Sequence, residues 1–418
     1  MVRMQEREIS LLMHYLDDVF PLQFPFPETA HLGKREWLLT ILSSTKAVYY
    51  ATLSLSLLHK EACLDTSEIE EGLIWREEKT RYYILALRES QQLLQGLRSN
   101  TGKDSLKGHI NALANTVQLI SFESSCLSKG DWQIHLRAGT SLIPALIESW
   151  KMIVRSHKPT SSVWSRLDAS DFCTIANGDP LSFECIGSLR FFTNMLAAFG
   201  VLSCVSLGPM APFMDYRYLM DNHAGLIQMD QIIGCKNWVM STILDVGILD
   251  QWKREELSHF RLSMKELTRR ATSIEMVLES GIKEARSGGV VDIVTSIYAT
   301  SALTYLHSVV SGLNPYLSEV QDSVSRTITL LKQLPDSRVV SSLVWPLCIT
   351  GCMASPDHEA FFTGIIHASG LTQPALRNGW YVLEIMENAW KIRDLMTQPS
   401  AITWEDMING HNPPTLLI

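Results

Sequence analysis

The residues of this chain best suited to chemistry lie on one predicted helix, Val290–Ser311. Its polar side chains recur at steps of four, three and four residues, which places them on a single face: Thr300, Thr304, His307 and Ser311. Tyr298 and Tyr305 fall on the opposite face. Hydroxyl and imidazole groups that line a cavity can polarise a carbonyl or assist the loss of water. The alternative is that neighbouring helices satisfy these groups, as they do for most buried polar atoms.

A second polar pair interrupts another apolar segment. Arg190 and Asn194 lie four residues apart beside Phe191. An arginine buried in such a segment must form an ion pair or face a polar cavity. Asp215, Asp245 and a ligand oxygen are the candidate partners. A structural ion pair is the commoner arrangement, so the sequence leaves both roles open for Arg190.

Aromatic side chains supply the third candidate feature. Trp238 and Trp345 fall in helices predicted to be internal. Their rings could stack on a polyene or a quinone methide, although packing in the core is the default for tryptophan. The predicted catalytic residues are Tyr305, His307 and Arg190. The predicted substrate-binding residues are Asn194, Phe191, Trp238, Tyr298, Thr304 and Trp345.

Metal and cofactor chemistry find no support in the sequence. None of the common nucleotide-binding, metalloprotease or serine-hydrolase motifs occurs. No pair of the eight cysteines has Cys-x-x-Cys spacing, and no two of the twelve histidines lie three or four residues apart. The sequence therefore predicts no metal and no cofactor, and any reaction would depend on shape, stacking and hydrogen bonds.

Charge and hydropathy bear on the partners. The formal net charge is −8 and no dense basic run occurs, which argues against nucleic-acid binding. The two long uncharged stretches, 191–214 and 293–318, contain prolines, glycines or many hydroxyl groups, so we expect core helices and no membrane span. We predict an intracellular protein, cytoplasmic with the nucleus as an alternative, that binds an apolar small molecule.

The elements that must position these residues are helices. Periodicity of about 3.6 dominates, and no alternating strand pattern stands out. We predict an all-α fold, a large multi-helix bundle of stacked antiparallel helices in a single domain, 1–418. A break at Ser156–Ser162 divides an N-terminal lobe, 1–155, from a core bundle, 163–418, with a central cavity.

Helix bounds follow from the apolar pattern and from breaking residues. The predicted helices that bear most on the site are Ser10–Phe20, Glu36–Cys63, Leu219–Ile233, Lys236–Lys253, Ser263–Glu279, Val290–Ser311, Leu317–Leu334 and Ser337–Met353. Ser263 followed by Glu266 forms a capping-box pattern at a helix start.

Several segments together resemble the fungal-specific transcription factor family. They are Arg7–Asp17, Gly234–Val239, Leu249–Lys253, Tyr305–His307, Ser311–Pro315, Ser325–Pro335, Leu343–Met353 and Trp404-x-x-Met407. The resemblance implies an all-helical domain that holds a small-molecule or regulatory cavity. In that family a zinc-cluster DNA-binding module precedes this domain, whereas here six residues precede it and none is cysteine. We therefore expect a standalone member that does not bind DNA.

Standalone members of the family also resemble cofactor-free cyclases of fungal tropolone sesquiterpenoid pathways, which assist hetero-Diels–Alder closure. The apolar loop Ser206–Pro212 is compatible with binding of an apolar ligand. The resulting prediction is a cofactor-independent pericyclase of fungal secondary metabolism. The alternative is a non-enzymatic ligand-sensing or co-regulatory protein, and in either case a homodimer is an open option.

Overall fold

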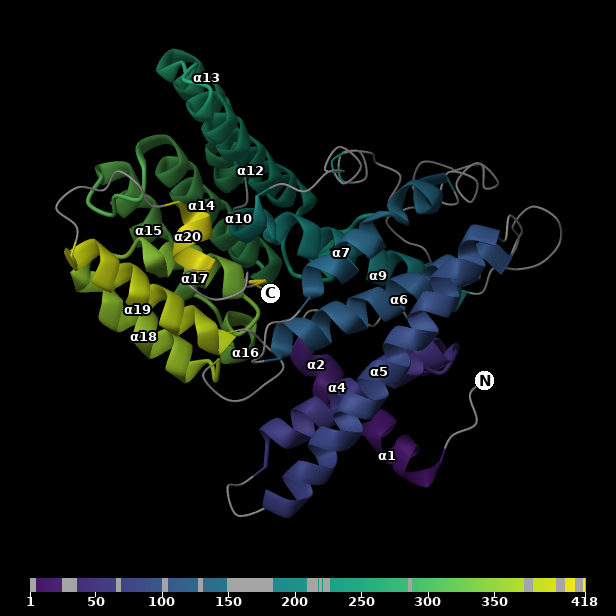
Figure 1. Ribbon diagram of the computed structural model, residues 1–418. Coiled ribbons are helices and arrows are strands. Elements are labelled where there is room, and N and C mark those ends of the chain that lie inside the picture. The colour runs from purple at the N-terminus through teal and green to yellow at the C-terminus, as the bar shows by residue number, and fades with distance from the viewer. Residues whose placement is uncertain are drawn as a thin grey trace. The chain divides into compact units, whose positions relative to one another are not determined.

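In the computed structural model most of the described residues lie in helices (Figure 1). The described residues are 5–24, 36–64, 69–99, 104–126, 131–148, 183–208, 217, 220, 226–284, 288–371, 379–395, 403–409 and 416–417. Every regular element within them is helical, which confirms the predicted all-α class. The predicted break at 156–162 lies outside the described residues.

The chain divides into two compact units. Unit 1 comprises Met1–Ala197, Asn222–Gln228 and Pro374–Leu376. Unit 2 comprises Ala198–Asp221, Met229–Gln373 and Arg377–Ile418. The expectation of a single domain with a boundary near residue 160 stays a prediction.

Unit 1 is built around the long helices that follow its N-terminal segment. Its elements are α1 (Glu6–His14), a π-helical turn (Tyr15–Val19), α2 (Phe20–Gln23), α3 (Glu36–Leu42), α4 (Lys46–Ala62), α5 (Ile69–Ser99), α6 (Asp104–Ser125), α7 (Trp132–Thr140) and most of α9 (Phe183–Leu202). Helix α4 packs on α1, α5 and α6, and α6 packs on α7. Leu53, Leu55 and Leu57 of α4 are fully buried, so α4 forms the centre of this unit.

The predicted single helix Glu36–Cys63 is wrong, because the structure divides it into α3 and α4. The break contains three consecutive hydroxyl residues. Ser43 donates to the Leu39 carbonyl and Ser44 to the Ile41 carbonyl, at 2.8 and 2.6 Å. Thr45 is extended, and its Oγ1 accepts from the Val48 amide as an N-cap. Hydroxyl groups that bond to nearby backbone compete with helix continuation, which accounts for the break.

Unit 2 is a bundle around α14. Its elements are α10 (Cys204–Leu207), a 3-10 turn (Met229–Gln231), α12 (Asn237–Ser258), α13 (Met264–Glu284), α14 (Val290–Ser311), α15 (Ser318–Leu331), α16 (Ser337–Val340), α17 (Val344–Cys352), α18 (Pro356–Ala368), α19 (Gly379–Leu395) and α20 (Trp404–Asn409). Helices α12, α13, α15 and α17 all pack on α14. Among the described residues α14 is the one helix long and apolar enough to cross a membrane. However, 83% of its apolar 18-residue stretch is buried inside the protein. It is therefore a core helix.

Two predicted helices of unit 2 differ from the structure. Ser337–Met353 is two helices, α16 and α17, separated by a short turn. Ser342 Oγ donates to the Val339 carbonyl in that turn, at 2.6 Å, which again diverts a backbone acceptor from the helix. Residues 226–233 of the predicted helix Leu219–Ile233 contain a 3-10 turn instead of an α-helix, because the amides of Gln228 and Met229 bond to asparagine side chains rather than to a preceding turn.

Helices α12 and α13 form a hairpin that projects from the rest of unit 2 (Figure 1). The turn between them ends α12 as a Schellman motif: the Arg261 amide donates to the Glu256 carbonyl and the Phe260 amide to that of Leu257. Phe260 takes the left-handed position of this motif, with φ 56°, where glycine is usual. A side chain costs about 1–2 kcal/mol in that conformation.

Candidate functional site

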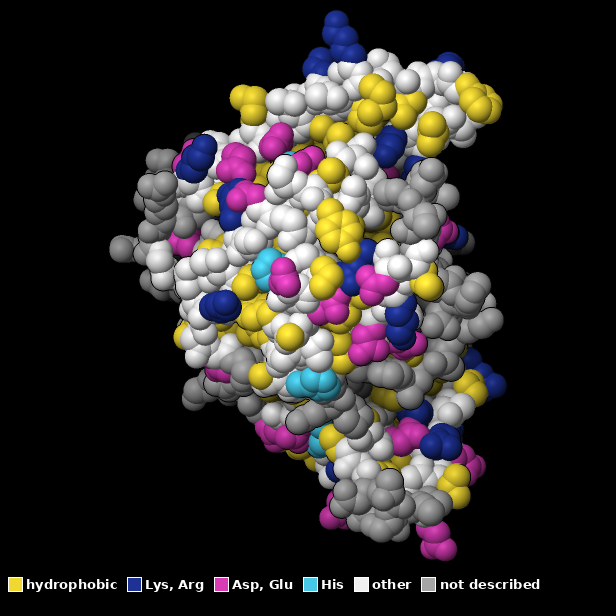
Figure 2. All heavy atoms as spheres, turned by 90° about the vertical axis from the view of Figure 1, so that its left-hand side faces the viewer, with side chains coloured by type: hydrophobic (Ala, Val, Ile, Leu, Met, Phe, Trp, Pro, Cys, Tyr) yellow, Lys and Arg dark blue, Asp and Glu magenta, His cyan; other side chains and the backbone are white. Residues whose placement is uncertain are grey.

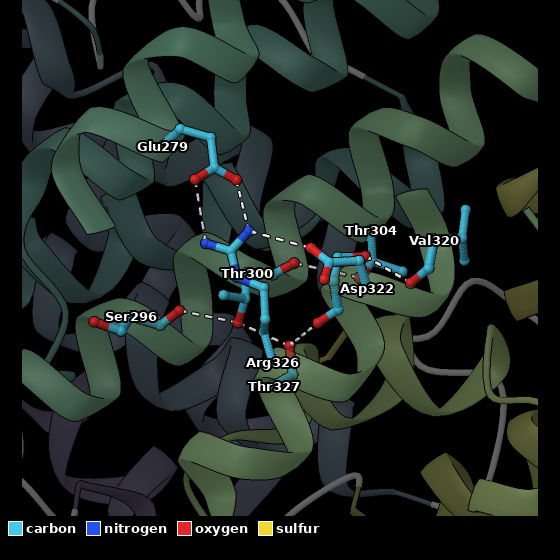
Figure 3. Close-up of polar contacts among 9 residues, drawn as sticks. Glu279, Ser296, Thr300, Thr304, Val320, Asp322, Arg326 and Thr327 are labelled. Carbon is cyan, nitrogen blue, oxygen red and sulfur yellow. Dashed lines mark hydrogen bonds and ion pairs between the residues drawn. The ribbon is translucent and has the colours of Figure 1, made fainter. Parts of the chain in front are cut away.

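The polar face of α14 is joined to α15 by a ladder of hydroxyl groups (Figure 3). Thr327 donates to Thr300 at 2.7 Å, and Thr304 lies 2.8 Å from Ser323. All four side chains are buried. On another face, Ser301 bonds to Thr350 of α17 at 2.9 Å. Protein groups therefore satisfy Thr300 and Thr304, two members of the stripe that the sequence singled out, and Thr304, a predicted substrate contact, has a structural partner.

An ion-pair cluster covers the outer end of this ladder. Arg326 of α15 binds Glu279 of α13 through two hydrogen bonds, at 2.6 and 3.3 Å, and also lies 3.6 Å from Asp322 (Figure 3). The Arg326 hydrogen bonds lower the pKa of Glu279. The cluster clamps α13 to α15 across α14.

His307 lies next to this cluster on α14. Burial lowers its pKa, although four carboxylates act in the opposite direction: Glu275, Glu319, Glu279 and Asp322. A half-buried imidazole with a depressed pKa is neutral at physiological pH, so it can accept or donate one hydrogen bond. The predicted catalytic role of His307 stays a prediction.

The opposite face of α14 carries an aromatic cluster. Tyr298 stacks on Trp345 of α17, with ring centroids 6.2 Å apart and planes 9° apart. Tyr305 meets Trp345 edge-on at 6.2 Å and Trp404 of α20 edge-on at 6.0 Å. Trp404 in turn donates to Ser308 at 2.7 Å. Three predicted site residues, Tyr298, Tyr305 and Trp345, are thus brought together.

Two polar atoms in this cluster stand out. Within the described part of the chain, neither the Tyr305 hydroxyl nor the Trp345 Nε1 has a hydrogen-bond partner, and both residues are at most 1% exposed. Burial raises the pKa of Tyr305 well above its usual value, so its hydroxyl keeps its proton. Buried donors without partners cost about 1–3 kcal/mol each. The cluster therefore presents two hydrogen-bond donors within an apolar surround.

The remaining predicted residues of α9 belong to unit 1. Phe191 is fully buried among Phe20, Phe24, Trp37 and Phe192, with centroids 5.1–5.7 Å away. The Asn194 amide donates to the carbonyls of Arg190 and Leu226 at 2.7 and 3.0 Å, and its oxygen accepts from the Gln228 amide at 2.7 Å. Asn194 therefore fastens residues 226–228 to α9, and Phe191 packs in the core.

Arg190 and Trp238 complete the predicted set. Arg190 is half-buried on α9. Of the two carboxylates among its three candidate partners, Asp215 lies outside the described residues, and Asp245 pairs with Arg217 at 2.7 Å. Trp238 of α12 covers Gly281 of α13, where a Cβ atom would lie 2.3 Å from the indole. Trp238 thus closes the base of the α12–α13 hairpin.

The sequence did not reveal a polar chain in unit 1. His14 Nε2 lies 3.0 Å from His59 Nδ1, His14 Nδ1 lies 2.8 Å from Asp18, and the Cys63 sulfur lies 3.9 Å from His59 Nδ1. Each half has an i, i+4 spacing, His14 with Asp18 and His59 with Cys63, which was the available signal. Because His14 and His59 lie 45 residues apart in the sequence, spacing alone does not predict their contact.

This chain of groups favours proton sharing over nucleophilic chemistry. Burial lowers the pKa of His14 and of His59, and burial raises the pKa of the Cys63 thiol. Both imidazoles are therefore neutral at pH 7, and the thiol is protonated. Among the described residues, no three His, Cys, Asp or Glu side chains are arranged to hold a metal ion.

Comparison with known proteins identifies related chains. The model of the fungal specific transcription factor domain matches residues 10–418. The chain is 62% identical to the trichothecene biosynthesis transcription regulator TRI10 of Trichoderma arundinaceum, over 100% of this chain and 99% of that protein. It is 52% identical to TRI10 of Fusarium sporotrichioides, over 99% and 98%. The ustiloxin B cluster transcription factor of Aspergillus flavus is 24% identical, over 99% of this chain and 73% of that protein. No solved structure matches.

These relatives overturn the enzymatic prediction. The predicted cofactor-independent pericyclase, or hetero-Diels–Alderase, is wrong, because proteins 52–62% identical over nearly their whole length are named transcription regulators. The likeness to tropolone-pathway cyclases likewise has no support. The error arose because a shared helical scaffold does not determine activity. The predicted intracellular location agrees with regulatory relatives.

Proposed function

We propose that this chain, which belongs to the fungal-specific transcription factor domain family, regulates the transcription of trichothecene biosynthesis genes. The observation that carries the proposal is the 62% identity with a regulator of that name over the full length of both chains. Regulation of transcription implies action in the nucleus. The buried hydroxyl ladder and aromatic cluster serve as the scaffold of a regulatory domain.

We also propose that regulation proceeds through protein contacts and without sequence-specific DNA binding by this chain. The net charge of −8 supports this view, since DNA-binding surfaces are basic. On the hairpin, the basic residues Arg261, Arg269 and Arg270 are engaged by Glu256 and Glu266.

Gene deletion tests the regulatory proposal. Deleting the gene should abolish or strongly reduce transcripts of the trichothecene biosynthesis genes, and the intact gene should restore them. Chromatin immunoprecipitation of the tagged protein, compared with binding of the purified protein to the same promoter fragments, tests the mode of action. Occupancy in cells without binding in vitro is the expected result. Unchanged transcripts after deletion would contradict the regulatory function, and direct binding in vitro would contradict the proposed mode.

A second proposal concerns ligand response, and the unpaired donors of Tyr305 and Trp345 support it. A largely apolar molecule with acceptor oxygens would complement these donors, and a trichothecene, which carries ether and epoxide oxygens on a hydrocarbon skeleton, has this chemistry. Calorimetric titration of the purified protein with a trichothecene should show binding, and Tyr305→Phe should weaken it about tenfold through loss of one buried hydrogen bond. Equal binding by the variant, or no binding by the natural protein, would refute the ligand proposal and leave the regulatory one intact.

A further inference from the structure

The tip of the α12–α13 hairpin exposes an apolar surface. Leu257, Phe260 and Met264 are 56%, 97% and 58% exposed. Figure 2 shows hydrophobic side chains beside basic ones on the projection at the top of the view. Together with Lys265, which is exposed and follows Met264, these residues are called the hairpin tip.

Phe260 packs against no part of the protein core. It occupies the left-handed position of the Schellman motif, with φ 56°, and its ring is almost fully in solvent. Glycine would relieve the backbone strain there without loss of any packing. A strained bulky residue with no internal contact is the pattern of a functional position.

The hairpin holds this ring on a rigid support. The Arg270 guanidinium stacks on Trp252, 4.1 Å from the ring centroid, and joins α13 to α12. Glu266 binds Arg269 at 2.8 Å and Arg270 at 2.7 Å, and these hydrogen bonds lower its pKa to about 2. Leu267 of α13 is fully buried, and α13 packs on α12. An aromatic anchor on a preorganised arm is the usual form of an interaction hot spot.

The same chain carries a surface suited to receive this anchor. An open groove of about 490 Å³ lies along α5 of unit 1. The residues that line this α5 groove are Leu73, Arg76, Glu77, Thr80, Arg81 and Ile84. Leu73 and Ile84 are 58% and 45% exposed, so the groove is apolar at both ends.

One charged residue on each surface is available to form an ion pair with the other surface. Neither Lys265 at the hairpin tip nor Glu77 in the α5 groove has an ionic partner among the described residues. Two arginines also line the groove: Arg76 is engaged by Glu61, at 2.8 Å, and the Arg81 guanidinium lies over the Tyr82 ring, 5.1 Å from its centroid. Glu77 is the carboxylate of this lining. A Lys265–Glu77 pair beside a buried phenylalanine would fix the orientation of the contact.

We propose that the hairpin tip of one copy of this chain docks in the α5 groove of a second copy, with Phe260 as the anchor. Sedimentation equilibrium of the full-length protein tests this assembly. Its average mass should rise with protein concentration. Phe260→Gly should weaken the association about tenfold or more, while its thermal unfolding midpoint rises because the strain at φ 56° is relieved. Greater stability with weaker association distinguishes an interface residue from a structural one.

A charge exchange tests the pairing itself. Lys265→Glu and Glu77→Lys should each weaken association, and the double variant should restore it. Leu395→Ser is the matched control, because Leu395 is an 84% exposed leucine on α19 and its loss should change nothing. A protein that is monomeric at every concentration, an unaffected Phe260→Gly variant, or a double variant as weak as the single ones would overturn the proposal. A change in Leu395→Ser equal to that in Phe260→Gly would do so as well.

Discussion

Single residues on α14 show why hydroxyl groups stand in a hydrophobic core. Thr300 and Thr304 meet Thr327 and Ser323, and Ser301 meets Thr350, so hydroxyls on this helix are met by side chains of α15 and α17. Valine at Thr300 or Thr304 would pack as well, but it would remove the hydrogen bond between the helices, and the hydroxyls of Ser323 and Thr327 would keep only their bonds within α15. The ladder therefore selects one register between α14 and its neighbours.

Removing one member of the ladder should destabilise the protein. Thr304→Val leaves Ser323 without its interhelical partner, and we expect a loss of about 1–2 kcal/mol in unfolding free energy. Urea unfolding followed by circular dichroism measures it. Thr329→Val is the matched control, since Thr329 is exposed and bonds only to its own helix. Equal effects of the two variants would show that the ladder contributes nothing specific.

The paired histidines of unit 1 should make stability depend on pH. Burial lowers the pKa of His14 and of His59 below 6.5, so the unfolded chain binds protons that the folded protein does not. The stability that these neutral imidazoles contribute is therefore fully present above pH 6.5. It is lost as the pH falls toward the lowered pKa values of the folded protein. His59→Asn keeps a hydrogen-bonding group and removes one titration, so its stability should decline less between pH 7.5 and pH 5.5. Parallel declines would contradict this account.

At the scale of elements, the sequence predicts helices better than their interruptions. Apolar periodicity with a glycine on each side placed α14 at the observed residues, Val290–Ser311. One half of the capping box predicted at Ser263 is present: the Glu266 amide donates to the Ser263 hydroxyl at 3.3 Å, whereas the Glu266 carboxylate binds Arg269 and Arg270. The break at Ser43–Thr45 was missed because hydroxyl residues are also tolerated inside helices, and only the local hydrogen bonds decide.

The site was less predictable than the helices. The sequence grouped Tyr298 and Tyr305 on one face, and the structure adds Trp345 to them. Asn194 was predicted to contact a ligand, and its hydrogen-bond partners are the Arg190 carbonyl one turn earlier and backbone groups of residues 226–228, to which no helical spacing links it. Contacts between distant segments depend on tertiary packing, which periodicity along one helix does not encode.

The base of the α12–α13 hairpin should be sensitive to one added methyl group. In Gly281→Ala the Cβ would meet the Trp238 indole at 2.3 Å, and we expect a loss of about 1–3 kcal/mol. Gly364→Ala on α18 is the control: nothing lies within 4 Å of its Cβ, and it should stabilise by about 0.5–1 kcal/mol through helix propensity. Thermal unfolding distinguishes them. A neutral Gly281→Ala would mean that Trp238 moves aside without cost.

At the scale of the whole molecule, each unit has its own core. Phe191 is fully buried in unit 1 and Phe362 in unit 2. Either change to alanine should cost about 3–5 kcal/mol. We expect differential scanning calorimetry to resolve two transitions, of which Phe191→Ala lowers one and Phe362→Ala the other. A single transition that both variants shift equally would show that the units unfold as one.

The position of α14 in the chain has a consequence for synthesis. Two of the helices that cover it, α15 and α17, are made after it. While the ribosome is still translating them, the nascent chain carries a segment as apolar as a membrane anchor with half of its cover missing. Incompletely folded chains with exposed apolar surface aggregate unless chaperones bind them. The apolar surface of α14 can therefore be buried completely only after residues up to Cys352, the end of α17, have left the exit tunnel.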